Sequence, residues 1–215
     1  MEIRVLSSDD VQKALPMAEA IEGMKRAYSR LSSGRVEMPL RSRVHVPEQE
    51  GVLLTMPAAL PDDSEMAVKL VTVFGKNPAR GFPLIHAAVL VLDTENGQIK
   101  ALMDGEVLTA VRTGAGVGAA TELLASTDAV SVAIIGSGKQ ACSQLDAVCT
   151  VRSIRQAWVY SPNPEHAQNF VEEMSGVGPI PKDIQAVTSS AEAVKNADIV
   201  CTATTSSTPV ISFKN

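Results

Sequence analysis

Residues 131–141 read SVAIIGSGKQA, and this stretch decides how the second half of the chain folds. Residues 132–135 are apolar and mostly β-branched, as in a short buried strand. Gly136 allows the sharp turn that must follow, Gly138 lets a phosphate approach the backbone, and Ala141 lets helix and strand pack closely. The stretch therefore predicts the first strand, phosphate loop and helix start of a dinucleotide-binding Rossmann unit.

The pattern GxGxxA occurs twice, at residues 114–119 and at residues 136–141. It binds a pyrophosphate only where a buried strand is followed directly by a helix whose first amides are free. The first match follows Thr109-Ala-Val-Arg-Thr, which is already helical, so only the second match satisfies this condition. A plain strand-to-helix turn is the alternative reading of residues 136–141, and the βαβ surroundings favour the dinucleotide loop.

From residue 131 onward, strand-like and helical stretches alternate. The predicted strands cover 132–136, 157–161, 184–188 and 198–204, and the predicted helices cover 139–151, 164–174 and 191–196. This order is typical of a parallel, doubly wound sheet. A complete Rossmann domain commonly has about six strands. We therefore expect a Rossmann domain over residues 126–215 whose C-terminal part is missing.

The first part of the chain predicts a different architecture. A helix begins at Ser7 or Ser8, where acidic residues follow, and apolar residues at helical spacing continue it to Gly34. Short apolar runs between residues 38 and 104 predict a sheet, and Glu-Asn-Gly at 95–97 predicts a hairpin, so part of the sheet is antiparallel. Together with a glycine-rich helix over 108–125, these elements predict an α+β domain over residues 1–125. The fold class is α/β.

Composition narrows the class of protein. The chain is 45% apolar and 20% charged, has a net charge of −5, and scatters its basic residues. These values argue against a nucleic-acid partner, and no apolar run is long enough for a bilayer. The three cysteines have neither CxxC spacing nor metal-ligand clustering, so we expect no metal site. The sequence indicates a cytoplasmic protein.

The end of the second predicted Rossmann strand bears on the choice of cofactor. An acidic residue there would bind the ribose 2′-hydroxyl of NAD, but residues 159–163 read Val-Tyr-Ser-Pro-Asn. Ser161 and Asn163 could donate hydrogen bonds to a 2′-phosphate, although no arginine is present. We therefore predict an NAD(P)H cofactor, with NADP slightly favoured over NAD.

Three segments place basic residues in apolar or small-residue surroundings. Lys69 shares one face of a predicted strand with Ala67, Val71 and Val73, so it either binds a ligand carboxylate or lies on an edge or solvated face. Arg112 falls in the first turn of the helix predicted over 108–125, where the helix amides would add to its attraction for a carboxylate. A salt bridge to Asp104 or Glu106 is its alternative.

Arg41 and Arg43 alternate along one predicted strand and therefore share a face. They make a second possible cationic pair, and either could equally be solvated.

The sequence resembles the ornithine cyclodeaminase and mu-crystallin family. The matching segments are MPLRSRV at 38–44, GVLLTMPAAL at 51–60, AVKLVTVF at 67–74, the stretch at 89–121 that contains MDG and TAVRT, and AIIGSGKQA at 133–141. The resemblance covers essentially the whole chain.

The resemblance implies a homodimer whose N-terminal domain carries the substrate pocket and the dimer interface, and a Rossmann domain that binds NAD(H) or NADP(H). It implies that Lys69 and Arg112 contact a small amino- or imino-acid substrate and serve catalysis, and that Arg41 or Arg43 helps to hold its carboxylate. Arg41, after Met-Pro, fits the family position better. We predict cofactor binding by Gly136, Ser137, Gly138, Lys139, Gln140, Ala141, Ser161, Asn163, Thr202, Thr204 and Thr113.

Two departures from the family pattern shape the expected reaction. Cyclodeaminases of the family carry an acidic residue at the position of Leu54, and leucine cannot meet the second amine of ornithine. The family's catalytic aspartate follows the next Rossmann strand, beyond Asn215, so we expect this fragment to be inactive alone.

The resemblance implies hydride transfer to a cyclic ketimine such as pyrroline-2-carboxylate. Ornithine cyclodeamination and alanine-type dehydrogenation are alternative reactions. A non-catalytic protein that binds NADPH or a small ligand is an alternative of another class.

Overall fold

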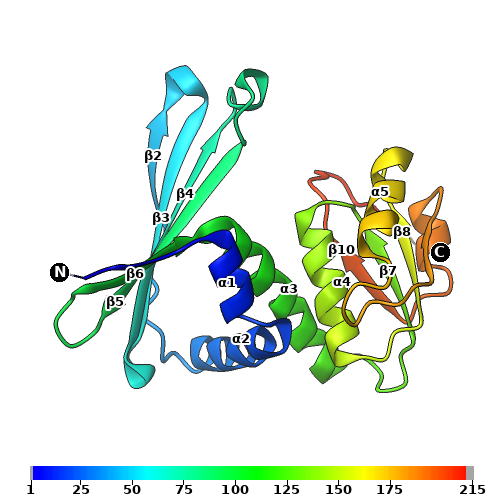
Figure 1. Ribbon diagram of the computed structural model, residues 1–215, viewed down its shortest axis with the longest axis horizontal. Coiled ribbons are helices and arrows are strands. Elements are labelled where there is room, and N and C mark those ends of the chain that lie inside the picture. Colours follow the sequence, from blue (N-terminus) through cyan, green and yellow to red (C-terminus); the bar gives the residue numbers. More distant parts are fainter. Residues whose placement is uncertain (1, 212–215) are drawn as a thin grey trace. The chain divides into compact units, whose positions relative to one another are not determined.

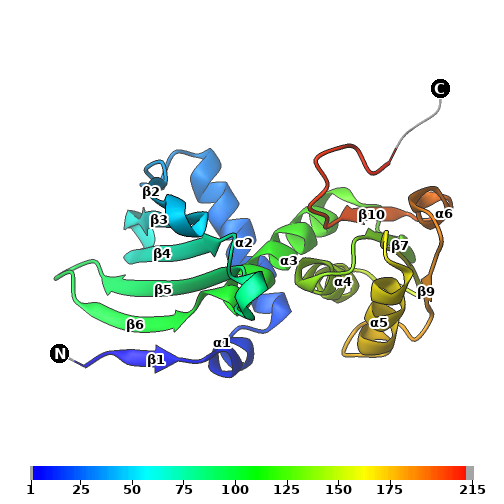
Figure 2. The ribbon, with the colours of Figure 1, turned by 90° about the horizontal axis from the view of Figure 1, so that it is seen from above.

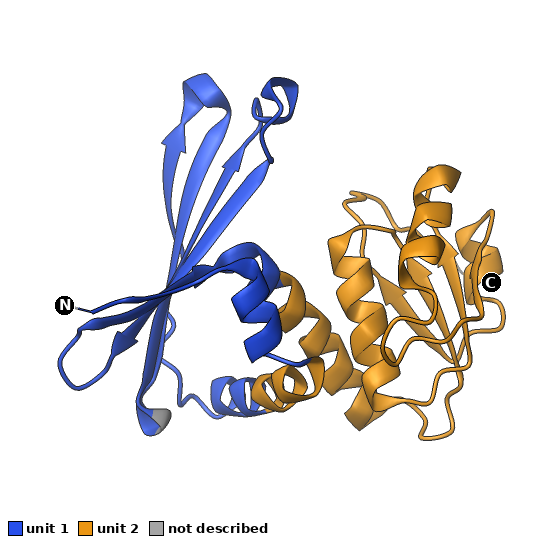
Figure 3. Cartoon of the chain, in the orientation of Figure 1, with its two compact units in different colours: residues 1–16, 26–109 blue, residues 17–25, 110–215 orange. Residues whose placement is uncertain are grey.

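The computed structural model describes residues 2–211, with the backbone alone at Asp63. The chain divides into two compact units (Figure 3): unit 1 contains Met1–Pro16 and Arg26–Thr109, and unit 2 contains Met17–Lys25 and Ala110–Asn215. The division falls inside two helices, after Lys25 and after Thr109. The domain boundary predicted at residue 125 stays a prediction. Within the described part of the chain, no helix is long and apolar enough to cross a membrane.

Unit 1 is built on a six-stranded sheet with the order β1-β6-β5-β4-β3-β2 (Figure 2). The strands are β1 (Arg4–Leu6), β2 (Ser42–Val46), β3 (Gly51–Leu60), β4 (Glu65–Phe74), β5 (Ile85–Asp93) and β6 (Ile99–Asp104). β1 pairs with β6 in parallel, and the other neighbours are antiparallel. The predicted hairpin is confirmed between β5 and β6, where Gly97 has a φ of 73°.

Two helices, α1 (Ser8–Ala14) and α2 (Met17–Ser32), occupy the region where we predicted one continuous helix. That prediction was wrong because Pro16 lacks an amide hydrogen and disfavours helical geometry at Leu15, whose φ and ψ are −129° and 77°. The predicted start is confirmed, since Ser7 caps α1 and receives the amide of Asp10 at 3.3 Å.

Helix α3 (Gly105–Leu124) begins three residues earlier than predicted. The reason is Asp104, whose carboxylate accepts the amide of Val107 at 2.8 Å and so caps the helix. Gly105 permits this start, because a Cβ there would lie 2.7 Å from the backbone of Ala87 and Ala88 in β5.

Unit 2 contains a four-stranded parallel sheet with the order β10-β7-β8-β9. Figure 1 labels β7, β8 and β10, and Figure 2 labels β9. Its elements are β7 (Ser131–Ile135), α4 (Lys139–Val151), β8 (Gln156–Tyr160), α5 (Pro164–Met174), β9 (Ile184–Ala186), α6 (Ser190–Val194) and β10 (Ile199–Thr202). This order matches the first four strands of the Rossmann order 3-2-1-4-5-6. The predicted α/β class with a parallel sheet is confirmed.

Helices cover both faces of this sheet, as the period-two alternation of its strands requires. One cluster joins Val132 and Ile134 of β7 to Leu145 of α4 and Phe170 of α5. The opposite cluster joins Ala133 and Ile135 of β7 to Ala193 of α6. Because every residue of β7 is buried, this strand fixes the loop that follows it.

Candidate functional site

The loop after β7 crosses the sheet edge at Gly136. Its amide donates to the carbonyl of Tyr160 at 2.8 Å, and the amide of Ala203 donates to the carbonyl of Ile135 at 2.8 Å. Gly136 has a φ of 117°, and a Cβ there would lie 2.2 Å from the carbonyl oxygen of Ala203. Only glycine fits this position, because both the backbone conformation and the space exclude a side chain.

Gly138 differs from Gly136, because the space around it is empty. It is the N-cap of α4, no side chain caps this helix end, and a Cβ at Gly138 would meet no atom within 4 Å. The protein itself therefore does not require glycine there. Because the first amides of a helix attract anions, the uncapped N-terminus of α4 and the free space beside it fit a phosphate group.

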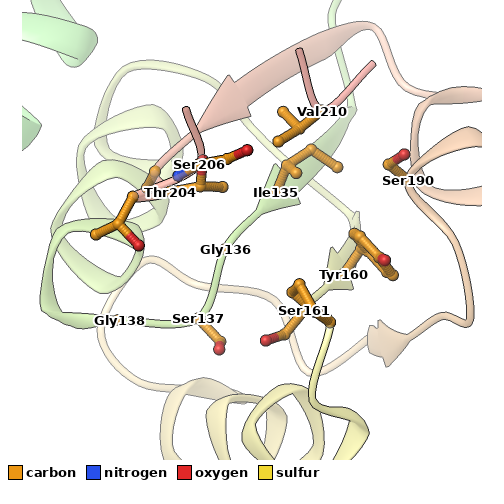
Figure 4. A pocket seen from close by; sticks show the side chains of 13 residues that line it. Ile135, Gly136, Ser137, Gly138, Tyr160, Ser161, Ser190, Thr204, Ser206 and Val210 are labelled. Carbon is orange, nitrogen blue, oxygen red and sulfur yellow. The ribbon is translucent and has the colours of Figure 1, made fainter. Parts of the chain in front are cut away.

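A cavity of about 500 Å³ adjoins this loop (Figure 4). It is lined by Ile135, Gly136, Ser137, Gly138, Tyr160, Ser161, Pro162, Ser190, Ala203, Thr204, Thr205, Ser206 and Val210. None of these described residues is charged, and seven of them carry a hydroxyl. Figure 4 shows the hydroxyls of Ser137 and Ser161 on the same side of the loop. The cavity offers many neutral hydrogen-bonding groups to a polar ligand.

Five of the predicted cofactor residues line the cavity: Gly136, Ser137, Gly138, Ser161 and Thr204. The sequence analysis missed several other lining residues, among them Tyr160 at the end of β8, Ser190 at the start of α6 and Val210 after β10. A usable signal existed, because the carboxyl ends of parallel strands meet at one edge of the sheet, where ligands bind.

The other predicted cofactor residues lie outside the cavity lining. Lys139, Gln140 and Ala141 form the first turn of α4, Thr202 ends β10, and Thr113 lies in α3. Asn163 caps α5 by accepting the amide of Glu165 at 3.0 Å. Their contact with a cofactor stays a prediction.

Gln140 has a distinctive environment among these residues. Its carboxamide oxygen is buried and has no hydrogen-bond partner among the described residues. A buried acceptor without a donor is unfavourable by about 1–3 kcal/mol. A ligand with an amide or hydroxyl donor would relieve this cost.

Lys69 lies in the interior of the sheet of unit 1. β4 has a neighbour on each side, and Lys69 pairs with Met56 of β3 and Val89 of β5. The edge-strand interpretation of Lys69 is therefore excluded, and the residue is half-buried. Because paired residues share a face, Lys69 stands in a row of apolar side chains.

The register also places the arginines and Leu54. Arg43 pairs with Leu54, and Leu54 pairs with Val71, so all three share the face of Lys69. Arg43 is exposed on the edge strand β2, and Arg41 is exposed just before it. Leu54 is thus an apolar neighbour of Lys69 on this face.

Arg112 lies in the third turn of α3, eight residues into the helix. The prediction that it occupies the first turn was wrong, because Asp104 starts the helix three residues earlier. The free first-turn amides are therefore too far along the helix to assist Arg112. Its side chain is exposed and forms no ion pair with any residue that the structure describes.

Burial shifts the pKa of two buried thiols and of one half-buried carboxyl among the described residues of unit 2. Burial raises the pKa of Cys149 to about 12 and that of Cys201 to about 11. Burial also raises the pKa of the Asp146 carboxyl. Among residues 2–211, no group of three His, Cys, Asp or Glu side chains could hold a metal ion.

A comparison with protein families matches residues 1–214 to the ornithine cyclodeaminase/mu-crystallin family. The chain is 33% identical over 210 residues to a Delta(1)-pyrroline-2-carboxylate reductase of Bacillus cereus, covering 98% of this chain and 64% of the relative. It is 30% identical over 210 residues to the ketimine reductase mu-crystallin of Rattus norvegicus, covering 96% and 65%. The chain thus spans slightly less than two thirds of the Bacillus cereus relative's length.

Solved structures show the same similarity. The Thermococcus litoralis Delta(1)-pyrroline-2-carboxylate reductase in complex with NADH and L-proline superposes with a TM-score of 0.88 and 42% identity, over 97% of this chain and 64% of that one. An archaeal alanine dehydrogenase dimer with bound NAD gives a TM-score of 0.86 and 30% identity, over 98% and 63%.

Proposed function

The chain belongs to the ornithine cyclodeaminase/mu-crystallin family, and on this basis we propose that it serves as an NAD(P)-dependent oxidoreductase that reduces a small cyclic ketimine of the pyrroline-2-carboxylate type. The observation that carries the proposal is the neutral, hydroxyl-rich cavity at the Gly136 loop of the Rossmann sheet. Such a cavity at the switch point of a parallel sheet is where a dinucleotide binds. The Thermococcus litoralis relative, 42% identical, binds NADH and L-proline.

The residues of unit 2 fit a dinucleotide. The uncapped N-terminus of α4 and the free space at Gly138 would hold its pyrophosphate, and Ser137 and Thr204 would donate hydrogen bonds. The buried oxygen of Gln140 would accept a donor from the ligand. When bound, the nicotinamide ring would supply the hydride.

We propose that NADPH is accepted and slightly preferred over NADH. Ser161 is buried at the end of β8 and lines the cavity where NAD enzymes carry an acid. Asn163 and the N-terminus of α5 follow, so a 2′-phosphate would meet donors and no carboxylate from residues 160–163. Replacing Ser161 with aspartate is expected to raise the KM for NADPH at least tenfold and to leave that for NADH within about threefold.

The proposed substrate interactions use the cationic groups. Lys69 and Arg112 would bind the carboxylate and orient the reacting carbon, with Arg41 or Arg43 assisting. Extending the register one pair beyond Ser42 places Arg41 opposite Met56, in the row of Lys69, which favours Arg41. Leu54 on this face offers no anchor for a second amine, which favours a ring ketimine over ornithine.

The function is tested with the protein expressed from its complete gene, by following NADPH and NADH absorbance with pyrroline-2-carboxylate and by assaying ornithine for ammonia release. We expect ketimine reduction and little ammonia. Rapid ammonia release without ketimine reduction would identify a cyclodeaminase. Cofactor binding without turnover of any substrate would identify a binding protein.

Alanine-type dehydrogenation is the second candidate, because the alanine dehydrogenase with bound NAD is 30% identical and superposes closely. Pyruvate and ammonia in the same absorbance assay test it. Turnover faster than with pyrroline-2-carboxylate would replace the proposed substrate.

A homodimer is proposed from the open face of the sheet in unit 1. Val5, Leu102 and Val44 lie on the face opposite Lys69 and are exposed by 69%, 36% and 58%. An apolar sheet face of this kind needs a partner. Light scattering is expected to give the dimer mass, and Leu102→Lys is expected to lower it. A monomeric wild-type protein at micromolar concentration would contradict the proposal.

We propose a cytoplasmic location, which the three free cysteines favour, because thiols persist in reducing compartments.

A further inference from the structure

Helices α3 and α4 touch through their backbones inside unit 2. A Cβ at Gly114 would lie 2.3 Å from the carbonyl oxygen of Ser143 and 2.6 Å from its carbonyl carbon. One turn later, a Cβ at Gly118 would lie 3.1 Å from the Cβ of Ala147. The backbone of Ser143 cannot move aside as the end of a side chain could, so the contact at Gly114 sets the separation of the helices.

This contact joins two functionally important segments. Both helices advance by four residues between the first contact pair and the second, so they run in the same direction through the crossing. Arg112 therefore precedes the contact by two residues on α3, and Lys139, the first residue of α4, precedes it by four on the other helix. The phosphate loop comes directly before Lys139.

A second anchor holds the far end of α3. Nη2 of Arg152 donates to the carbonyls of Thr121, Glu122 and Ala125 at 3.0, 3.0 and 2.8 Å. Arg152 binds the C-terminal end of α3 by hydrogen bonds, and Ser143 contacts the middle of α3 at Gly114. Together these two interactions prevent α3 from sliding along α4 or rotating against it. The place of Arg112 along α3 is thereby fixed relative to α4.

We infer that Gly114 is a positioning residue for Arg112. Its missing side chain lets α3 lie close to α4, and this distance determines where the guanidinium of Arg112 stands relative to the phosphate loop. The inference rests on the proposed function, in which Arg112 binds the substrate carboxylate.

The test variant is Gly114→Ala in the protein expressed from its complete gene. Ordinary Cβ contacts begin near 3.4 Å, so the helices must separate by about 1 Å, a displacement that can lower a rate about 100-fold. We expect kcat/KM for pyrroline-2-carboxylate to fall between about 10-fold and 100-fold, chiefly through KM. The Kd of NADPH should stay within about threefold, because the loop keeps its own backbone hydrogen bonds at Gly136.

A double-mutant cycle with Arg112→Ala separates positioning from general damage. If Gly114 acts through Arg112, Gly114→Ala should change kcat/KM by less than about threefold once Arg112 is gone. A Cβ at Gly118 would lie 3.1 Å from the Cβ of Ala147 in α4 and 2.7 Å from the side chain of Ile21 in α2. Gly118→Ala therefore crowds the same crossing less severely and should show the same pattern more weakly, which provides a test should Gly114→Ala not fold. Leu123→Ala, at an exposed position of α3, is the control and should behave as wild type.

Three results would overturn the inference. In the first, Arg112→Ala lowers kcat/KM but the glycine variants that fold keep the wild-type value. In the second, the fold-decrease in kcat/KM of the double variant equals the product of the two single decreases. Either result would show that Gly114 does not position Arg112. If Arg112→Ala itself retains wild-type kcat/KM, the proposed role of Arg112 fails and the inference fails with it. The single variants therefore distinguish the two failures.

Discussion

Replacing the half-buried Arg152 with methionine is expected to destabilise unit 2 more than a substitution at a half-buried position usually does. Nε of Arg152 donates to the carbonyl of Ser126 at 2.9 Å, and Nη2 donates to Thr121, Glu122 and Ala125 at 2.8–3.0 Å. The carbonyl of Glu122 lies in the last turn of α3 and that of Ala125 just after it, where the helix supplies no amide. The carbonyls of Thr121 and Ser126 also accept the amides of Ala125 and Ala129, at 3.0 and 3.3 Å. Methionine keeps most of the apolar stem and removes all of these donors.

The magnitude follows from the number of donors. Nε provides one hydrogen and Nη2 provides two, so three N–H groups serve the four carbonyls of other residues. A hydrogen bond from a charged donor contributes about 1.5–3 kcal/mol to the free energy of unfolding. Because water can partly reach the freed carbonyls, we expect each lost hydrogen bond to cost about 1.5 kcal/mol or less. We expect a total loss of about 2–4 kcal/mol, or a fall in Tm of roughly 5–10 °C for a chain of this size.

The assay is urea unfolding followed by the fluorescence of Trp158, the only tryptophan of the chain, which lies in β8 and reports on unit 2. The midpoint should fall without a change in slope. Arg155→Met is the matched control, because Arg155 is exposed and its side chain has no hydrogen bond to a described residue. A loss below about 0.5 kcal/mol for Arg152→Met, or equal losses for both variants, would refute the reasoning.

Three further predictions concern unit 2. Gly136→Ala should abolish NADPH quenching of tryptophan fluorescence and lower stability by more than about 2 kcal/mol, because it forces a side chain into a φ of 117°. The hydroxyl of Ser131 and the backbone amides of Val130 and Ser131 hold the pKa of Asp198 below its ordinary value. The stabilisation by this carboxylate is complete above about pH 4 and is lost as pH falls through the folded-state pKa. Asp198→Asn should therefore flatten the acid side of a plot of unfolding free energy against pH. Cys149 and Cys201, with pKa values of about 12 and 11, should react with a thiol reagent at pH 8 only after denaturation, as a count of released chromophore would show.

The sequence predicted the elements of unit 2 closely because each boundary has a local cause. Pro164 starts α5, Gly138 precedes α4, and the apolar run of β7 ends at Gly136. The residues of the cavity were predicted only in part. Ser190 and Val210 reach it through the order of the strands, a long-range property that no local pattern contains.

The misplacement of Arg112 has a similar origin. The apolar pattern begins at Leu108, so the helix was predicted to start there. In the structure the carboxylate of Asp104 caps the helix, which therefore starts at Gly105. A capping rule applied to Asp104 and Gly105 would have found the correct start. The glycine-rich composition of this helix has a long-range cause, because the backbone of Ser143 in α4 approaches Gly114.

The strands of the sheet in unit 1 are largely antiparallel, yet they carry apolar residues on both faces. Antiparallel strands usually alternate apolar and polar residues because one face meets water. In β4, residues 66–74 are half-buried on both faces, and apolar residues such as Val68 and Leu70 flank Lys69 on the opposite face. On the face of Lys69, Val89 is already buried within the protein, and the proposed substrate would place its carboxylate beside Lys69. On the other face Val5, Val44 and Leu102 are exposed, and in the proposed homodimer a second copy of the same sheet would bury them because its apolar surface matches theirs.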